Sequence, residues 1–139
     1  MKKITIDLNV LLDFLNKRKK HMQAAKIIEL CNKNQIQGYV CAHEITTLAY
    51  FLMKNHNDSH KVKFVLNEIL DMFKIIPITE TILRKALNSN INDFEDAVIE
   101  ISSQKNEIDF IVTRNLNDFK QSSVKSVSPT EFLALYNKM

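Results

Sequence analysis

The sequence has few of the residues that break helices or bind soft metals. Its 139 residues include one glycine, Gly38, and two prolines, Pro77 and Pro129, a composition that favours long helices. A single glycine excludes a phosphate-binding P-loop and a dinucleotide-binding fingerprint, which both need several glycines. The two cysteines, Cys31 and Cys41, are too few for a disulfide framework or a zinc knuckle. We therefore expect both to be small buried side chains without a catalytic role.

Long apolar runs and a strong net charge are also missing. No uninterrupted apolar segment approaches the roughly 20 residues that span a bilayer, and the start MKKITID has no long apolar region after its lysines. We therefore expect neither a membrane helix nor a secretory signal, and a cytoplasmic location is the default. The net charge of +3 is too small to predict nucleic-acid binding by itself, although NKRKKH at residues 16–21 gathers basic side chains in one place.

The rest of the sequence alternates short β-rich segments with longer amphipathic ones. The β-rich segments are KITID, GYVCA, FKIIPI, DFIVT and SVKSV, and helical periodicity covers residues 22–33, 43–55, 60–72, 80–88 and 93–104. Ser128, Pro129 and Glu131 supply a cap, a first-turn proline and a capping box for a last helix. The alternation predicts one domain over residues 1–139, a three-layer α/β/α fold with a mostly parallel sheet of about four to five strands.

Acidic side chains follow the predicted strands, at the edge where ligands bind to open α/β sheets. Asp7 ends the first β-rich segment, Glu44 follows the second, and Asp118 follows the fourth. Asp96 adds a fourth acid from DFEDAVIE. A carboxylate at the end of a buried central strand is costly unless it is paired or binds a metal, and no Lys or Arg adjoins Asp7 in the sequence. Four converging carboxylates need a divalent cation, and oxygen-only ligation favours Mg²⁺ or Mn²⁺.

Each acid also has a simpler explanation when it is taken alone. Asp93, like other acids in first helical turns, can stabilise a helix through its dipole without any ligand. Glu95 is expected to face solvent and can complete a capping box with Asn92. Asp13 and Glu100 are expected to be ordinary acids on helix faces.

Four segments together resemble the signature segments of the PIN-domain ribonucleases. They are IDLNVLLDFL, AHEITTLAYFL, DFEDAVIE and IVTRNLNDF, in the family's order over nearly the whole chain. The resemblance implies a PIN-like fold and a metal-dependent endoribonuclease, with an acidic quartet that binds Mg²⁺ or Mn²⁺ and consists of Asp7, Glu44, Asp96 and Asp118. It implies one further catalytic acid, Asp93, and three polar supporting residues: Asn9, Thr113 and Asn115.

The resemblance also implies partners. Many members of the family are VapC-type toxins that form homodimers and are held inactive by an antitoxin, so the expected partners are RNA, an antitoxin and a second copy of the chain. Apolar residues that can serve these protein contacts, or the core, are Tyr50, Phe51, Phe64 and Leu66. An acidic rim repels RNA unless basic groups assist, and the candidates for phosphate contact are Lys17, Arg18, Lys19, Lys20 and Arg114.

The sequence offers three alternatives to a ribonuclease. Haloacid-dehalogenase-like phosphatases resemble this start but carry D-x-D, whereas Asn9 stands at the second acidic position here. A non-catalytic PIN-like module that binds RNA or protein is the alternative, and metal-dependent stabilisation that is lost in Asp7→Asn would argue against it.

His56 and His60 are spaced as on one helix face, but Asn57, Asp58 and Ser59 predict a turn and cap rather than a zinc site.

Overall fold

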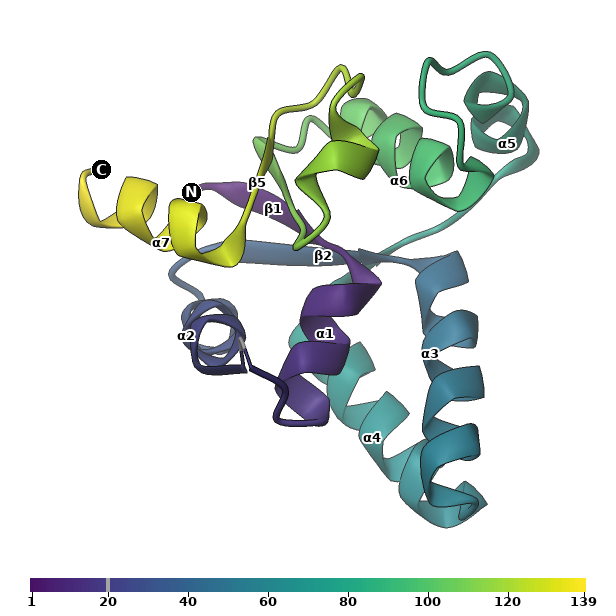
Figure 1. Ribbon diagram of the computed structural model, residues 1–139, viewed down its shortest axis with the longest axis vertical. Coiled ribbons are helices and arrows are strands. Elements are labelled where there is room, and N and C mark those ends of the chain that lie inside the picture. The colour runs from purple at the N-terminus through teal and green to yellow at the C-terminus, as the bar shows by residue number, and fades with distance from the viewer. Residues whose placement is uncertain (20) are drawn as a thin grey trace.

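A parallel sheet with helices on both faces forms the centre of the protein (Figure 1). The computed structural model describes residues 1–19 and 21–139, which contain five strands: β1 (Lys3–Ile6), β2 (Gln37–Cys41), β3 (Lys74–Ile76), β4 (Phe110–Val112) and β5 (Ser126–Val127). Their order is β3-β2-β1-β4-β5, so the first strand of the chain is the central one. All neighbouring pairs are parallel. The predicted α/β/α architecture is confirmed.

Helices make the connections between the strands. They are α1 (Leu8–Leu15), α2 (His21–Asn32), α3 (Ala42–His56), α4 (Ser59–Met72), α5 (Glu80–Ala86), α6 (Phe94–Lys105), the 3₁₀ helix η1 (Leu116–Phe119) and α7 (Pro129–Asn137). In Figure 1, α1 to α4 lie below the sheet, and α5 and α6 lie above it. Within the described residues, no helix is both long and apolar enough to cross a membrane.

Alternate strand residues pack into two hydrophobic cores, one on each face of the sheet. Ile4 and Ile6 of β1 point into the larger core, which contains residues of α1, α2, α3, α4 and α7. Ile111 of β4 and Cys41 of β2 point into the other core, with α5, α6 and η1. Phe132 of α7 is fully buried in the larger core. Burial on both faces is what a wholly parallel sheet requires.

Gly38 of β2 lies where the backbone packs too closely for a side chain. A Cβ atom at this position would lie 2.6 Å from Cys31 Sγ and 2.9 Å from a ring carbon of Phe73. Both cysteines of the chain are free and buried, as predicted. The only glycine in the sequence therefore allows α2 and the end of α4 to approach the sheet.

Local capping signals define several helix ends. Ser128 Oγ accepts from Glu131 N at 3.1 Å, and Glu131 Oε1 accepts from Ser128 N at 3.2 Å, which is the predicted capping box of α7. Asn57 ends α3 in the left-handed region with φ 48°, and Asp58 caps α4. The predicted turn between His56 and His60 is confirmed.

Candidate active site

The carboxyl ends of β1 and β4 lie side by side and form the base of a candidate site. Asp7 follows β1, and its backbone N–H donates to Val112 O at 3.0 Å, which extends the pairing of the two strands. Thr113 follows β4 on the neighbouring strand. Because β1 is the central strand, the Asp7 side chain is only 7% exposed.

Asp7 caps α1 and accepts hydrogen bonds from the neighbouring strand end. Its Oδ1 accepts from Leu8 N at 2.8 Å, while its Oδ2 accepts from Thr113 Oγ1 at 2.7 Å and from Asn9 Nδ2 at 3.1 Å. Burial raises the pKa of Asp7, and the hydrogen bonds from Thr113 and Leu8 oppose this increase. These contacts hold the Asp7 carboxylate in one orientation.

Asn9 joins the start of α1 to the loop after β4. Its Oδ1 accepts from Arg114 N at 3.2 Å, and its Nδ2 lies 3.5 Å from Thr113 Oγ1. The backbone N–H of Asn115 donates to the same hydroxyl at 3.0 Å. Of the three residues predicted to support the site, Asn9 and Thr113 therefore contact Asp7, and Asn115 contacts Thr113.

Glu44 lies in the first turn of α3, directly after β2, and is 3% exposed. Its Oε1 accepts from Cys41 N at 3.3 Å, whereas its Oε2 has no hydrogen-bond partner within residues 1–19 and 21–139. Burial, and then the nearby charge of Asp7, raise the pKa of Glu44 well above its ordinary value. A buried carboxylate with a free oxygen is costly, and a bound cation would relieve that cost.

Asp96 and Asp118 add two acids from separate elements. Asp96 is partly buried in the first turn of α6, and Asp118 is exposed in η1. Burial, followed by the charges of Asp7, Asp93 and Asp118, raises the pKa of Asp96 to about 7. The carboxylates therefore repel one another, and a cation between them would remove the repulsion.

One cavity of about 300 Å³ collects these side chains. Its polar lining includes all four predicted ligands and Glu95, together with basic and amide groups: Asp7, Glu44, Asp96, Asp118, Glu95, Arg18, Arg114, Asn9 and Asn115. The all-oxygen set of carboxylates and the unpartnered Glu44 Oε2 suit Mg²⁺ or Mn²⁺. Among the described residues, no three His, Cys, Asp or Glu side chains are already grouped closely enough to hold a metal ion.

Asp93 lies outside this shared cavity. It is the N-cap of α6, and its Oδ2 accepts from Asp96 N at 3.1 Å. The predicted capping box between Asn92 and Glu95 is therefore wrong, because the helix is capped one residue later. Asp93 lines a neighbouring cavity of about 290 Å³, which Asp96 and Asp118 also line.

Two of the basic residues predicted to contact RNA line the acidic cavity. They are Arg18, from the loop after α1, and Arg114, from the loop after β4. Lys17, with φ 50°, and Lys19 are exposed in the same loop as Arg18 and are not among the lining residues of the acidic cavity. Lys20 lies outside the described residues.

Asp13 is buried in α1, contrary to the prediction. It was expected on an exposed helix face, but it is 1% exposed, and its Oδ1 accepts from Arg114 Nη1 at 3.0 Å. Arg18 Nη1 lies 3.8 Å from the same oxygen. The available signal was the run LNVLLDFL, in which apolar residues flank Asp13 on both sides and one turn earlier.

Glu100 was expected to be an ordinary acid on a helix face; it lies on α6, but it is buried, with 4% exposed. Its Oε1 accepts from Ser89 Oγ at 2.5 Å, and its Oε2 accepts from Ser123 N at 2.6 Å. Glu100 thereby ties two loops to α6. Because its partners are far from it in sequence, periodicity alone could not identify them.

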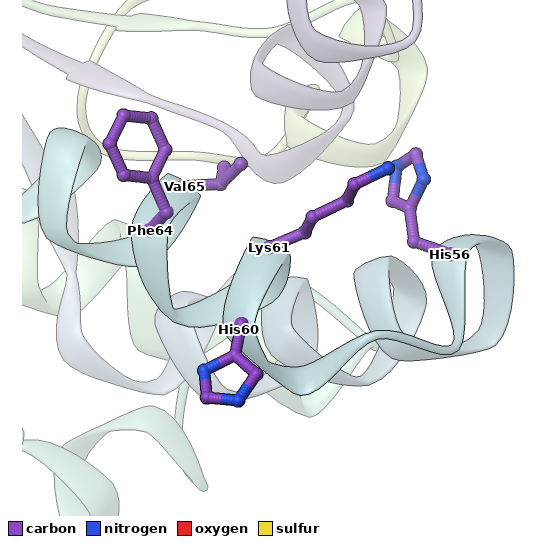
Figure 2. Close-up of a pocket in the computed structure, with 5 residues that line it drawn as sticks. All are labelled: His56, His60, Lys61, Phe64 and Val65. Atoms are coloured by element: carbon purple, nitrogen blue, oxygen red, sulfur yellow. The ribbon is translucent and has the colours of Figure 1, made fainter.

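A further cavity, of about 370 Å³, lies at the corner between α3 and α4 (Figure 2). It is lined by His56, His60, Lys61, Phe64 and Val65. Figure 2 shows the His60 ring pointing away from His56 and from Phe64. His56 ends α3, whereas Glu44 lies in its first turn, so this corner is at the opposite end of α3 from the acidic cavity.

The fold and site define an α/β protein with a cluster of carboxylates at the carboxyl edge of a parallel sheet. The sequence model of the PIN domain matches residues 3–117. The chain therefore belongs to the PIN-domain family, and the resemblance found in the sequence is confirmed. No curated protein sequence matches the chain.

Solved structures share this fold. VapBC2 from Rickettsia felis, bound to a DNA fragment from its promoter, contains a chain with 18% identity and a TM-score of 0.70 over 91% of this chain and 98% of that chain. A toxin-antitoxin complex from Klebsiella pneumoniae contains a chain with 21% identity and a TM-score of 0.68, and the match covers 91% of this chain and 97% of that chain. VapC20 from Mycobacterium tuberculosis, a sarcin-ricin loop cleaving toxin, has 14% identity and a TM-score of 0.63, and the match covers 78% of this chain and 86% of that chain. At these identities the likeness establishes the fold alone.

Proposed function

We propose that this protein is a metal-dependent endoribonuclease. The observation that carries the proposal is the meeting of four carboxylates from four elements in one cavity: Asp7, Glu44, Asp96 and Asp118. Membership of the PIN-domain family supports the proposal. A structural relative described as a sarcin-ricin loop cleaving toxin supports the same class of activity.

The four carboxylates would hold Mg²⁺ or Mn²⁺. Such a cation, when bound, polarises the phosphate and stabilises the negative charge that develops during hydrolysis. Thr113 and Asn9 donate to Asp7 Oδ2, so this carboxylate is oriented before a cation arrives. Glu44 Oε2 provides a second oxygen for the cation, because no described residue donates a hydrogen bond to it.

The remaining polar groups suit an RNA phosphodiester. Water attacks the phosphorus, the bond to the leaving oxygen breaks, and that oxygen gains a proton. Arg18 and Arg114 line the cavity and are the candidates to bind the phosphate charge. Asp96, in the cavity, and Asp93, in the neighbouring one, are the candidates to orient the attacking water.

Cleavage of total cellular RNA by the purified chain tests the proposal, with Mg²⁺, Mn²⁺ or a chelator. Asp7→Asn and Asp96→Asn are expected to abolish metal-dependent cleavage while the protein stays folded. Glu68→Gln makes the same kind of charge change at an exposed position of α4 and should cleave as the wild type does. Equal cleavage by Asp7→Asn would refute the nuclease site, and no cleavage by any protein would favour the non-catalytic binding module.

We also propose that the chain is the toxin of a toxin-antitoxin pair. Its structural relatives include chains from VapBC2 and from another toxin-antitoxin complex. Tyr50 of α3 is 62% exposed and Phe64 of α4 is 66% exposed, which supplies apolar surface for an antitoxin or for a second copy of the chain. Induced expression in a bacterial host should arrest growth with the wild type but not with Asp7→Asn. Sedimentation of the purified chain tests the proposed homodimer.

A further inference from the structure

A buried acid and two arginines form a cluster beside the four carboxylates. Asp13 lies on α1 with 1% of its surface exposed, and its Oδ1 is 3.0 Å from Arg114 Nη1 and 3.8 Å from Arg18 Nη1. Its Oδ2 is buried and has no hydrogen-bond partner in the described part of the chain. The contacts of the Asp13 carboxylate within the described residues are therefore those with the two guanidinium groups.

The contact with Asp13 leaves part of each arginine side chain exposed. Their side chains are 42% exposed for Arg114 and 41% exposed for Arg18, and both line the acidic cavity. One carboxylate faces two guanidinium groups, so the cluster keeps a net positive charge. That charge lies in the lining of a cavity that also contains five acids, where a polyanion would otherwise be repelled.

Arg114 is anchored at both ends. Its backbone N–H donates to Asn9 Oδ1 at 3.2 Å, and its guanidinium donates to Asp13. Both anchors belong to α1, the helix that Asp7 caps. Asp13 lies six positions after Asp7, which is about 9 Å along the axis at 1.5 Å per residue. A rigid helix therefore sets the spacing between the candidate metal ligand and the arginine anchor.

We propose that Asp13 is a positioning residue that orients Arg114 and Arg18 to bind the phosphate of RNA in the acidic cavity. Arginine side chains have much rotational freedom, and its loss on binding weakens an interaction unless the side chain is already held in place. Asp13 restricts that freedom before RNA binds and leaves the outer N–H groups available. The inference rests on the proposed ribonuclease function, because it assigns the phosphate as the ligand.

Simple electrostatics predicts the opposite effect of removing Asp13. If the carboxylate contributed only its charge, Asp13→Asn would make the region around Arg18 and Arg114 more positive and would strengthen RNA binding. If Asp13 positions the arginines, the same substitution weakens binding although the net charge becomes more positive. The sign of the change therefore separates the two roles.

The test is a double-mutant cycle with Asp13→Asn, Arg114→Ala and the double variant. A short labelled RNA that contains a site cleaved in total cellular RNA serves as substrate, and kcat and KM are measured separately. Glu100→Gln is the matched control, because Glu100 is also a buried, hydrogen-bonded acid but contacts Ser89 and Ser123 instead of arginine. Urea unfolding of every variant reports the structural cost independently of kinetics.

We expect Asp13→Asn to lower kcat/KM by about 10- to 100-fold, the range for losing one hydrogen bond to a charged group, with most of the loss in KM. Arg114→Ala should lower it at least as much, and the double variant should be little worse than Arg114→Ala. Glu100→Gln should lose stability and keep its kcat/KM. Unchanged kinetics or tighter binding in Asp13→Asn, or additive losses in the double variant, would overturn the inference.

A binding measurement distinguishes failure of this inference from failure of the ribonuclease proposal. Fluorescein-labelled single-stranded RNA of mixed sequence is titrated with the same variants in the presence of a chelator. If the wild type binds but never cleaves RNA, the nuclease is refuted, and weaker binding by Asp13→Asn would still support the positioning role. If the wild type neither cleaves nor binds RNA, both proposals are refuted.

Discussion

Replacing Glu44 by glutamine is expected to stabilise the metal-free protein and to destabilise it relative to the wild type when metal is present. Glu44 is 3% exposed, its Oε2 lacks a partner within the described residues, and its pKa is raised well above the ordinary value by burial and by Asp7. Glutamine keeps the shape, removes the titration and can donate from its amide nitrogen. The variant therefore removes the electrostatic cost of the ionised carboxylate, which in the wild type is relieved by a proton or by a bound cation.

The size of the effect follows from proton linkage. In the unfolded chain Glu44 ionises near 4.5, whereas the folded protein holds the proton to higher pH, so rising pH favours unfolding of the wild type. The cost is about 1.4 kcal/mol for each pH unit until the folded-state pKa is passed. Between pH 5 and pH 7 the Tm of the wild type should therefore fall relative to the Tm of the variant.

Metal reverses the order of stability. A cation at about 100 times its dissociation constant would stabilise the wild type by about 2.7 kcal/mol, and Glu44→Gln should lose most of this gain. Thermal unfolding is followed near pH 5 and near pH 7, with a chelator or with Mg²⁺, and Glu68→Gln serves as the exposed control. A variant that is less stable than the wild type in the chelator at pH 7, or that keeps the full response to Mg²⁺, would refute this reasoning.

Three further predictions concern packing and the support of Asp7. Gly38→Ala places a Cβ against Cys31 and Phe73 and should cost about 1–3 kcal/mol in urea unfolding; an unchanged midpoint would contradict this. Phe132→Ala empties a fully buried site and should cost about 3–5 kcal/mol by the same measurement, and a smaller loss would mean that the core collapses around it. Thr113→Val removes the 2.7 Å hydrogen bond to Asp7 and should lower RNA cleavage about tenfold or more in a folded protein, which full activity would disprove.

Local patterns in the sequence predicted most elements of the fold. The helices α2 to α7 and the five strands lie close to their expected ranges, because each has a clear periodicity or a capping signal. No range was predicted for the short helix α1, although Asp13 was expected on a helix face there. The capping box at α6 was placed wrongly, since Asn92 and Asp93 are both acceptable caps and only the structure chooses Asp93.

The candidate site was predicted in composition but not in its contacts. Asp7, Glu44, Asp96 and Asp118 follow strands or start helices, and parallel topology requires such positions to meet at one sheet edge. The contact of Asp13 with Arg114 joins residues far apart in the chain, and so does the contact of Glu100 with Ser123. No local periodicity records such pairs.

The sequence by itself determined the order of strands and helices, the parallel layering and the group of acids that gathers at the sheet edge. These depend on hydrophobic periodicity and on the connection rules of α/β folds, which act over short stretches of chain. Only the tertiary structure decided which acids are buried and which partners they have. Asp13 and Glu100 became buried because distant loops supplied Arg114 and Ser123 as partners, and burial of a charge is tolerated only where such a partner arrives.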